Sequence, residues 1–509
     1  MKKQLLILIL YLPCAVFYSS AQITFQKTFG GIDEDKGHSV QQTMDGGYII
    51  SGSTESFAIS ASDAYLIKTN AYGDTMWTRT FSRIGYEIGY SVQQTADTGY
   101  IICGSSGGSI YLIKTGANGN WLWSKALGIG AGASVEQTSD GGYIITGTID
   151  NGINDNDFYL IKADMNGDVV WSKKFGGNNS DNGFSGQQTT DGGYILAGNT
   201  SSFSDVCIIK TDSLGDTLWT RTYGGANLDW GYAVQQTTDG GYIITGLTGS
   251  FGAGDKDVYL IKTDTIGNLL WSKTFGGTYF DVGYDVRQTT DGGYIILGST
   301  TSWGGDDLYL IKTDANGDTL WTKAFGGTAF TFYGESIQQT TDGGYIITGY
   351  GHNTGALYDD VLLIKTDANG NSGCNEVITA TITSAPLTQI TNNIINVYSG
   401  VGGSSTSTTV YSGAITTTLC SAVGVNEIST AHAFFVSPNP TQGNFVIAFE
   451  GTITKGNIAI INILGESIFT GNISNESKRE INLKNISSGI YFIKVFDGEK
   501  SYCKKLIVE

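Results

Sequence analysis

Residues 283–300, "GYDVRQTTDGGYIILGST", and residues 307–327, "DLYLIKTDANGDTLWTKAFGG", make up one unit of the repeat that decides the fold. The turn "TDGG" joins the first two β-rich runs of the unit and "TDANGD" joins the last two. Both turns contain the Asp, Asn and Gly that hairpins use at positive φ. The unit therefore predicts four antiparallel strands, at 285–289, 293–300, 307–312 and 319–325.

The unit recurs seven times along the chain. The tyrosine of "DGGY", or of a close variant, stands at Tyr48, Tyr100, Tyr143, Tyr194, Tyr242, Tyr294 and Tyr345. Four strands repeated about every 50 residues are typical of propeller blades. We therefore predict an all-β protein in which residues 22–372 form a seven-bladed β-propeller. The absence of Pro between residues 22 and 372 agrees with strands that pair on both edges.

The last unit lacks its fourth run, because "SGCNEV" at 372–377 replaces the expected Trp and "FGG". A spare fourth run, "ITFQKTFGG", stands at residues 23–31. We predict that residues 23–31 complete the last blade, since this pairing leaves no open sheet edge.

Two repeated side chains are predicted to stabilise the scaffold. The Trp of the fourth run is expected to dock into the next blade, at Trp77, Trp123, Trp171, Trp219, Trp271 and Trp321. The Lys of the third run has, in six of seven units, an Asp three to five residues earlier. We expect a repeated structural ion pair from the lysines Lys68, Lys114, Lys162, Lys210, Lys262, Lys312 and Lys365.

The stretch "IKTDANGDTLWTK" resembles the tryptophan-docking repeats of quinoprotein-type propellers and, more distantly, the Asp-box hairpins of sialidase-like propellers. The resemblance covers residues 22–372 and implies the scaffold alone. The sequence has no adjacent cysteine pair such as quinone-dependent dehydrogenases carry, so their cofactor is not implied.

Residues 1–21 have the layout of a secretory signal peptide, with two lysines, an apolar run and a small-residue site before Gln22. No later stretch is long and apolar enough to span a bilayer. The net charge of −18 disfavours nucleic acid and anionic membrane as partners, because the phosphate charges would repel the chain.

Residues 373–430 are rich in Ser, Thr, Gly and Asn and are predicted to be a linker with some β character. Cys374 and Cys420 bracket it, and a disulfide between them would form in an oxidising compartment. Cys103 and Cys207 are expected to be small buried hydrophobes, and Cys503 has no evident partner.

Residues 431–509 form a separate β unit of about seven strands, with turn residues every 8 to 12 positions. This Ig-like unit closely resembles the type A C-terminal sorting domain of type IX secretion cargo. The resemblance implies passage through the periplasm and the type IX machinery, then release or attachment to surface lipopolysaccharide of a Gram-negative bacterium. Its matching residues include Pro438, Asn439, Pro440, Gly443, Gly465, Gly489 and Tyr491.

Comparison of the repeats separates a constant face of the propeller, which carries both turns, from a variable face. The variable loops include "GGIDEDKGH", "SRIGYEIGY", "GGNNSDNGF", "GGANLDWGY", "GGTYFDVGY" and "GGTAFTFYGES". Aromatic residues beside Asp and Asn could form a platform for a glycan or a peptide, or could pack the loops together. The candidates are Trp230, Tyr279, Phe280, Trp303 and Phe332.

A carboxylate precedes the Gly of the first strand by two residues at Asp35, Glu87, Asp181, Asp229 and Asp281. These carboxylates could surround the channel mouth and hold Ca²⁺, or could accept backbone N–H bonds as turn residues, which the repetition favours. The sequence otherwise indicates no metal or cofactor.

No nucleophile elbow, phosphate loop or CxxC motif occurs in the sequence. One constant and one variable face without a catalytic set favour a secreted or surface-displayed binding protein, with glycan or protein as ligand. A polysaccharide hydrolase that uses the acidic residues of the variable face is the alternative, and a purely structural surface protein is a third.

Overall fold

The computed structural model describes residues 22–508 except 60, 84, 153–154, 178, 201–204, 304, 354–355, 380–381, 385–388, 392–395, 400–403, 407–408, 412–414, 424–433, 438–440, 454, 463–466, 484–485 and 497–500. The chain divides into two compact units, one of Gln22–Val423 and one that contains Gly424–Glu509. Every regular element in the described ranges is a β-strand, so the protein is all-β.

The first unit consists of antiparallel sheets built from the sequence repeat. The strands in chain order are β1 (Ile23–Gly30), β2 (Asp35–Gln42), β3 (Tyr48–Thr54), β4 (Asp63–Thr69), β5 (Thr75–Ser82), β6 (Glu87–Gln94), β7 (Tyr100–Ser106), β8 (Ser109–Thr115), β9 (Trp121–Gln137), β10 (Tyr143–Asp150), β11 (Asn156–Ala163), β12 (Val169–Gly176), β13 (Asp181–Gln188), β14 (Tyr194–Thr200), β15 (Asp205–Thr211), β16 (Thr217–Gly224), β17 (Asp229–Gln236), β18 (Tyr242–Thr248), β19 (Asp257–Thr263), β20 (Leu269–Gly276), β21 (Asp281–Gln288), β22 (Tyr294–Thr300), β23 (Asp307–Thr313), β24 (Thr319–Phe325), β25 (Phe330–Gln339), β26 (Tyr345–Asn353) and β27 (Asp360–Thr366).

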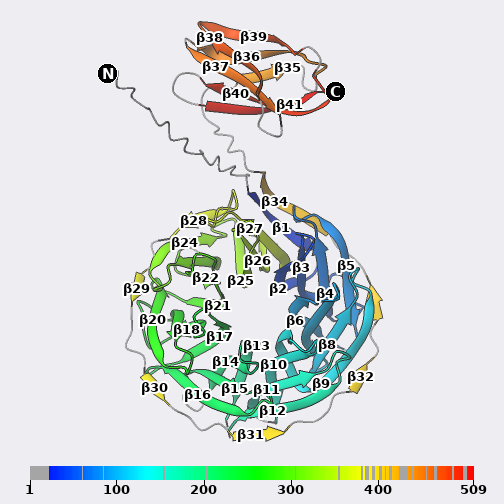
Figure 1. Ribbon diagram of the computed structural model, residues 1–509, viewed down its shortest axis with the longest axis vertical. Helices are drawn as coiled ribbons and strands as arrows, with labels where there is room; N and C mark the ends of the chain where they lie inside the picture. Colours follow the sequence, from blue (N-terminus) through cyan, green and yellow to red (C-terminus); the bar gives the residue numbers. More distant parts are fainter. Residues whose placement is uncertain are drawn as a thin grey trace, which may run out of the picture. The chain divides into compact units, whose positions relative to one another are not determined.

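Each repeat forms four neighbouring strands, and the long strand β9 serves both as the fourth strand of the second repeat and as the first strand of the third. Figure 1 shows the sheets arranged around a central opening, with first strands such as β17 and β21 inside and fourth strands such as β16 and β20 outside. First strands pack in the series β2, β6, β9, β13, β17, β21 and β25, and β25 packs against β2. The series of neighbours therefore returns to its first member.

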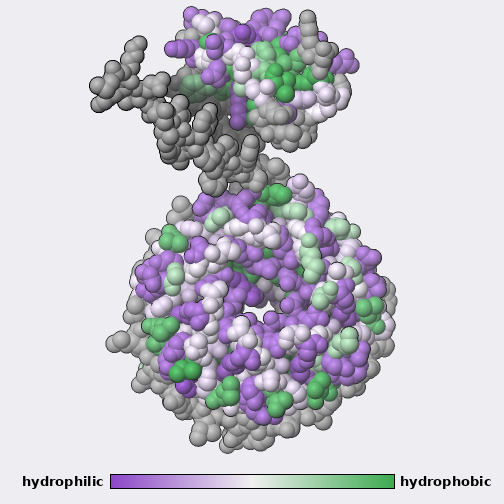
Figure 2. All heavy atoms as spheres, viewed as in Figure 1, coloured by the Kyte–Doolittle hydropathy of each residue, from purple (hydrophilic) through white to green (hydrophobic). Residues whose placement is uncertain are grey.

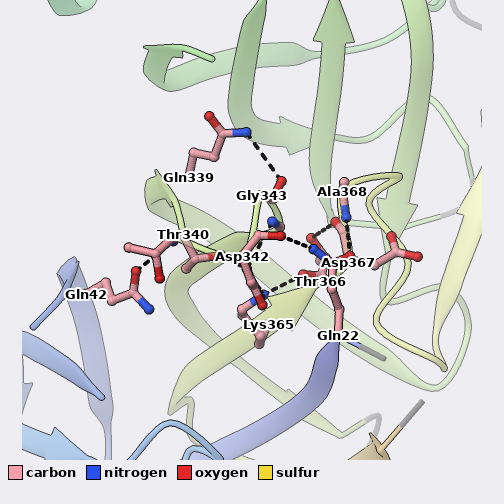
Figure 3. Close-up of polar contacts among 12 residues, drawn as sticks. Gln22, Gln42, Gln339, Thr340, Asp342, Gly343, Lys365, Thr366, Asp367 and Ala368 are labelled. Carbon is pink, nitrogen blue, oxygen red and sulfur yellow. Dashed lines mark hydrogen bonds and ion pairs between the residues drawn. The ribbon is translucent and has the colours of Figure 1, made fainter. Parts of the chain in front are cut away.

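The pairing predicted for residues 23–31 is confirmed. Strand β1 pairs antiparallel with β27, with Phe25 opposite Lys365 and Phe29 opposite Val361. Gln22 adds side-chain bonds at the same place, since its Nε2 donates to the carbonyl oxygen of Asp342 at 2.5 Å and its Oε1 accepts from the backbone N–H of Ala368 at 3.0 Å (Figure 3).

The apolar core lies between neighbouring sheets. The predicted docking of each Trp into the next repeat is confirmed, because the indole rings lie 5.7–6.3 Å from the "DGGY" tyrosine of the following unit in edge-to-face geometry. At the junction made by β1, Phe25 replaces the Trp and its ring lies 6.2 Å from that of Tyr48. Phe25 thus makes the contact of a seventh Trp.

Residues 373–430, which the sequence predicts to be a linker, contribute a further strand to the outer edge of the sheets. These strands, which we call the belt, pair with β24, β20, β16, β12, β9, β5 and β1 in turn. The Thr-rich runs suit this role, because β-branched residues favour extended strands. The belt consists of β28 (Glu376–Ile378), β29 (Ile382–Ser384), β30 (Gln389–Thr391), β31 (Asn396–Ser399), β32 (Ser404–Thr406), β33 (Thr409–Tyr411) and β34 (Ile415–Val423).

Cys374 precedes the belt and is disulfide-bonded, while Cys103 and Cys207 are free and buried as expected. Gln26 supports the predicted pairing of Cys374 with Cys420. It lies opposite Cys420 in the β1–β34 register, and its Nε2 donates to the carbonyl oxygen of Cys374 at 2.6 Å. A Cys374–Cys420 bond would tie the start of the belt to its last strand.

The second unit contains two antiparallel sheets that share one apolar core, formed by residues such as Ile447, Ile460 and Ile493. One sheet has the order β35 (Phe434–Ser437), β36 (Asn444–Ile453) and β39 (Glu476–Asn482). The other has the order β38 (Ser467–Ile473), β37 (Gly456–Asn462), β40 (Gly489–Phe496) and β41 (Ser501–Val508).

We predict that Phe25→Ala lowers the free energy of unfolding by about 3–5 kcal/mol, because the buried ring joins the two ends of the repeat array. Phe25→Trp, which restores the residue of the other units, should stay close to the wild type. Denaturant unfolding of the secreted chain measures both, with Ile32→Ala, which is 82% exposed, as the matched control. Equal stability of Phe25→Ala and Ile32→Ala would contradict the role of Phe25.

We predict that Cys420→Ser lowers the free energy of unfolding by about 4 kcal/mol, because the loop between the two cysteines would no longer be closed in the unfolded chain. Wild-type protein under reducing conditions should lose the same amount. A variant whose Cys374 still resists alkylation by iodoacetamide would show that Cys374 has another partner.

Candidate functional site

Each first strand contains a β-bulge beside a glycine, and the bulges place seven side chains at equivalent positions. In β17 the register passes from Gly231 opposite Gly246 to Ala233 opposite Thr245, so Tyr232 is the extra residue. A Cβ on Gly246 would overlap the carbonyl oxygen of Trp230, which explains the glycine there. The extra residues, which we call the collar, are His38, Tyr90, Ala133, Phe184, Tyr232, Tyr284 and Glu335.

The collar residues contact one another from repeat to repeat. The ring of Tyr232 lies 5.2 Å from that of Phe184 and 5.3 Å from that of Tyr284, and the ring of His38 lies 5.2 Å from that of Tyr90. All of these rings are half-buried, so each keeps an accessible part. A β-bulge commonly re-aims a side chain next to a functional site, and here it does so in every unit.

Glu335 brings a carboxylate to this aromatic collar. Its Oε2 lies 4.0 Å from Nδ1 of His38. Burial, followed by the negative charge of Glu335, raises the pKa of Tyr284 to about 12, and burial and the same charge raise the pKa of Tyr232 and Tyr90. These tyrosines therefore keep their hydroxyl protons at neutral pH and can donate hydrogen bonds.

The residues next to the collar line a polar cavity of about 420 Å³ in the central channel. The last backbone N–H of a first strand donates to a Gln or Glu side chain of the preceding repeat at 2.5–2.8 Å in six places. One of these bonds, from Gln42 to Gln338, joins the first repeat to the seventh. Figure 2 shows that hydrophilic residues surround the opening.

Three charged residues interrupt the repeated Gln and Ser lining of the channel. Arg287 replaces a Gln and lies 3.3 Å from Asp285, which replaces a Ser. Glu136 replaces another Gln, and burial raises its pKa although the charge of Arg287 acts in the opposite direction. Among the described residues of the channel, these three are the ones that carry a charge where other repeats have Gln or Ser.

The five carboxylates predicted for the channel mouth lie elsewhere. Asp35, Glu87, Asp181, Asp229 and Asp281 are each the first residue of a first strand and are 0–3% exposed. One oxygen of each accepts the backbone N–H of the residue four positions earlier, at 2.8–3.1 Å. This is the turn role that the repetition favoured, and the burial keeps the carboxylates away from any ligand in the channel.

The five predicted aromatic residues differ in exposure. Tyr279 is 64% exposed, whereas Trp230 is half-buried against the collar residue Tyr232. Phe280 lies under the ammonium group of Lys256, and Trp303 packs on Tyr309. Phe332 is buried on Phe330, so it packs inside the structure and cannot form part of a ligand platform. Phe332 is buried because it occupies the position of the buried first-strand carboxylates.

The seven repeated lysines form ion pairs, but with a different Asp from the one expected. Nζ of each Lys lies 2.9–3.0 Å from the Asp of the "TDGG" turn, or its equivalent, in the same repeat (Figure 3 shows Lys365 and Asp342). The third and second strands are neighbours, so the long Lys side chain reaches the turn. The Asp before the Lys remains at the other end of the strand.

The described residues of the predicted sorting domain have structural roles. Gly443 has a φ of 95°, which favours glycine, and Gly489 begins β40. Tyr491 is buried and donates its hydroxyl to the carbonyl oxygen of Ser487 at 2.8 Å. Pro438, Asn439, Pro440 and Gly465 lie outside the described residues.

Sequence reasoning did not identify the collar residues, although six of the seven lie in the variable loops quoted from the sequence. Each quoted loop ends near the bulge residue, for example "NLDWGY" at Tyr232 and "FYGES" at Glu335. The usable signal is the position after the first-strand Gly, where an aromatic residue or His occurs in five of the seven repeats.

Comparisons with known proteins place the C-terminal part of the chain. Residues 436–509 match the family model of the secretion system C-terminal sorting domain. This tail marks a protein that is secreted or attached to the cell surface of a Gram-negative bacterium of the Bacteroidetes type, and it implies interaction with the type IX secretion machinery. No helix of the described residues is long and apolar enough to cross a membrane.

No curated protein matches the chain. The chain is similar to the solved structure of Sqt1 from Chaetomium thermophilum at 9% identity, with 66% of this chain and 84% of that chain covered and a TM-score of 0.39. It is also similar to a DUF4221 family member from Bacteroides vulgatus at 9% identity, with 74% and 100% covered and a TM-score of 0.31. The biofilm matrix protein Bap1 of V. cholerae shares 12% identity, with 94% and 86% covered and a TM-score of 0.20.

The Lys–turn pairs predict an acid limit on stability. The hydrogen bond from Thr138 and the neighbouring Lys162 lower the pKa of Asp140 to about 2, below its value in the unfolded chain. Because the folded pKa is depressed, the stabilisation is complete above about pH 4 and is lost as the pH falls toward 2. Asp140→Asn should therefore melt below the wild type at pH 7, and the difference should disappear near pH 2. A constant difference across this range would contradict the pairing.

Proposed function

We propose that Gln22–Val423 is a seven-bladed β-propeller, exported by the type IX system together with an Ig-like sorting sandwich, that binds an extracellular glycan at the collar without catalysis. The series of first-strand contacts and the pairing of β1 with β27 support the propeller. Two sheets around one core support the sandwich. On the cell surface, lipopolysaccharide is the proposed point of attachment.

The observation that carries the binding proposal is the convergence of unlike side chains on one symmetric position. Tyr90, Phe184, Tyr232 and Tyr284 supply aromatic faces, and Glu335 supplies hydrogen-bond acceptors beside His38. Sugar rings bind to such sites through their C–H faces and hydroxyl groups. The residues at the equivalent positions differ between repeats, whereas the scaffold positions are nearly constant, which is the pattern of a binding surface on a fixed support.

A glycoside hydrolase remains the second candidate, on one observation. Glu335 is a half-buried carboxylate within the collar, and hydrolysis of a glycoside uses a pair of carboxyl groups. The residues first considered for this role, Asp229 and Asp281, are fully buried and cannot reach a substrate. Among the collar residues, Glu335 is therefore the carboxylate that could take part in hydrolysis.

We predict that Tyr232→Ala and Tyr284→Ala each weaken glycan binding about tenfold, because each removes a stacking face. A glycan array with the purified chain identifies the ligand, and calorimetry measures the affinities. Tyr279→Ala is the matched control, since Tyr279 is exposed outside the collar and should bind as the wild type does. Equal weakening by all three variants, or no glycan bound, would contradict the proposal, and product release abolished by Glu335→Gln would establish the hydrolase.

A further inference from the structure

Pairs of buried carboxylates lie at the junctions between neighbouring repeats. The third strand of six repeats has an Asp at its start, as the first residue in five of them and as the second residue, Asp157, in β11. In five of these six cases the first strand of the next repeat begins with a second carboxylate. The pairs are Asp63 with Glu87, Asp157 with Asp181, Asp205 with Asp229, Asp257 with Asp281, and Asp360 with Asp35. The Gly or Ser that ends the fourth strand lies between the two members of each pair.

The Asp205–Asp229 junction shows the arrangement. A Cβ on Gly224 would lie 2.7 Å from Oδ2 of Asp229 and would overlap Oδ1 of Asp205, so both carboxylates border one point. Oδ2 of Asp229 accepts the backbone N–H of Gly225 at 2.8 Å and the hydroxyl of Ser250 at 2.7 Å. The Oδ1 atoms of Asp205 and Asp229 are buried without a hydrogen-bond partner.

The Asp257–Asp281 junction repeats this geometry. Oδ2 of Asp281 accepts the N–H of Gly277 and the hydroxyl of Ser302, both at 2.8 Å. The Oδ1 atoms of Asp257 and Asp281 again are buried without a hydrogen-bond partner, and the two residues are at most 1% exposed. No Lys, Arg or His of the described residues forms an ion pair with any of the four carboxylates.

The chain contains its own comparison at the two remaining junctions. Between the second and third repeats, Ser109 and Gly130 occupy the two positions, and both carboxylates are absent together. Between the sixth and seventh repeats, Phe332 replaces the second carboxylate. There Oδ1 of Asp307 accepts the backbone N–H of Gly327 at 2.6 Å. Orphaned carboxylate oxygens at these strand starts therefore occur, in the described ranges, where two carboxylates meet.

Two ionised carboxylates buried beside each other strongly destabilise a fold unless a cation or a shared proton neutralises their charge. We propose that the paired-carboxylate junctions bind divalent cations, with Ca²⁺ as the ion of matching chemistry. Ca²⁺ takes oxygen ligands at flexible geometry, and the Asp205–Asp229 and Asp257–Asp281 junctions each offer two orphaned Oδ1 atoms and a Ser hydroxyl bonded to one of the two carboxylates. The ions would join neighbouring sheets, and this is a different position from the channel mouth considered from the sequence.

The test measures Ca²⁺ binding by the full secreted chain. After dialysis against EDTA, the chain is equilibrated with 1 mM Ca²⁺ (roughly the extracellular range for such sites), and bound metal is counted by mass spectrometry. We expect more than one Ca²⁺ per chain and a melting temperature about 5 °C or more above that in EDTA. Asp205→Asn and Asp257→Asn should each lose one equivalent, and the double variant should lose two.

Asp307→Asn is the matched control, because it removes an unpaired carboxylate of the same strand position and should leave the count unchanged. Asp205→Ser is a second variant, which places the residue found at Ser109 in the equivalent position, in case the amide is poorly tolerated. Retention of no Ca²⁺ or Mg²⁺, or an unchanged count in the double variant, would overturn the proposal. A melting temperature that rises on acidification from pH 7 to pH 5 and ignores Ca²⁺ would also overturn it, because a shared proton would then replace the cation.

Discussion

The pairing of β1 with β27 is the constraint on which the first unit depends. Every other repeat contributes its own fourth strand, but the seventh obtains one from the opposite end of the repeat array. The exchange places Phe25 against Tyr48 of the first repeat, in the geometry that a Trp adopts at the other junctions. Lys27 likewise bonds Asp74 at 2.6 Å, as Lys173 bonds Asp216 at 2.8 Å. The junction between the two ends of the repeat array therefore has the same aromatic contact and the same kind of Lys–Asp pair as other junctions.

The belt extends this arrangement to the outer edges. An exposed edge strand offers unpaired N–H and C=O groups to other chains, and the belt strands β28–β34 cover part of each outer edge. They do so in the reverse order of the repeats, so the chain returns to β1, where β34 pairs along eight register positions. The first strand thus lies between the last repeat and the end of the belt.

The β-bulge separates what is constant from what varies. The glycines beside the bulge cannot be replaced by larger residues, because the strands approach too closely for a side chain. The bulge also frees the extra residue from pairing, so that position accepts His, Tyr, Phe, Ala or Glu without a change in the ladder. A repeat protein can therefore vary the side chain at this position while its core stays the same.

The sequence by itself determined the all-β class, the strand pattern of the repeats, the pairing of residues 23–31 and the sorting tail. Hairpin turns, apolar runs and the missing fourth strand are local or countable features, and they carry this information. Only the tertiary structure decided the partner of the repeated Lys, the burial of Asp229 and Phe332, and the pairing of the belt strands β28–β34. These depend on which strands become neighbours. Such contacts join residues far apart in the chain, so no short stretch of sequence specifies them.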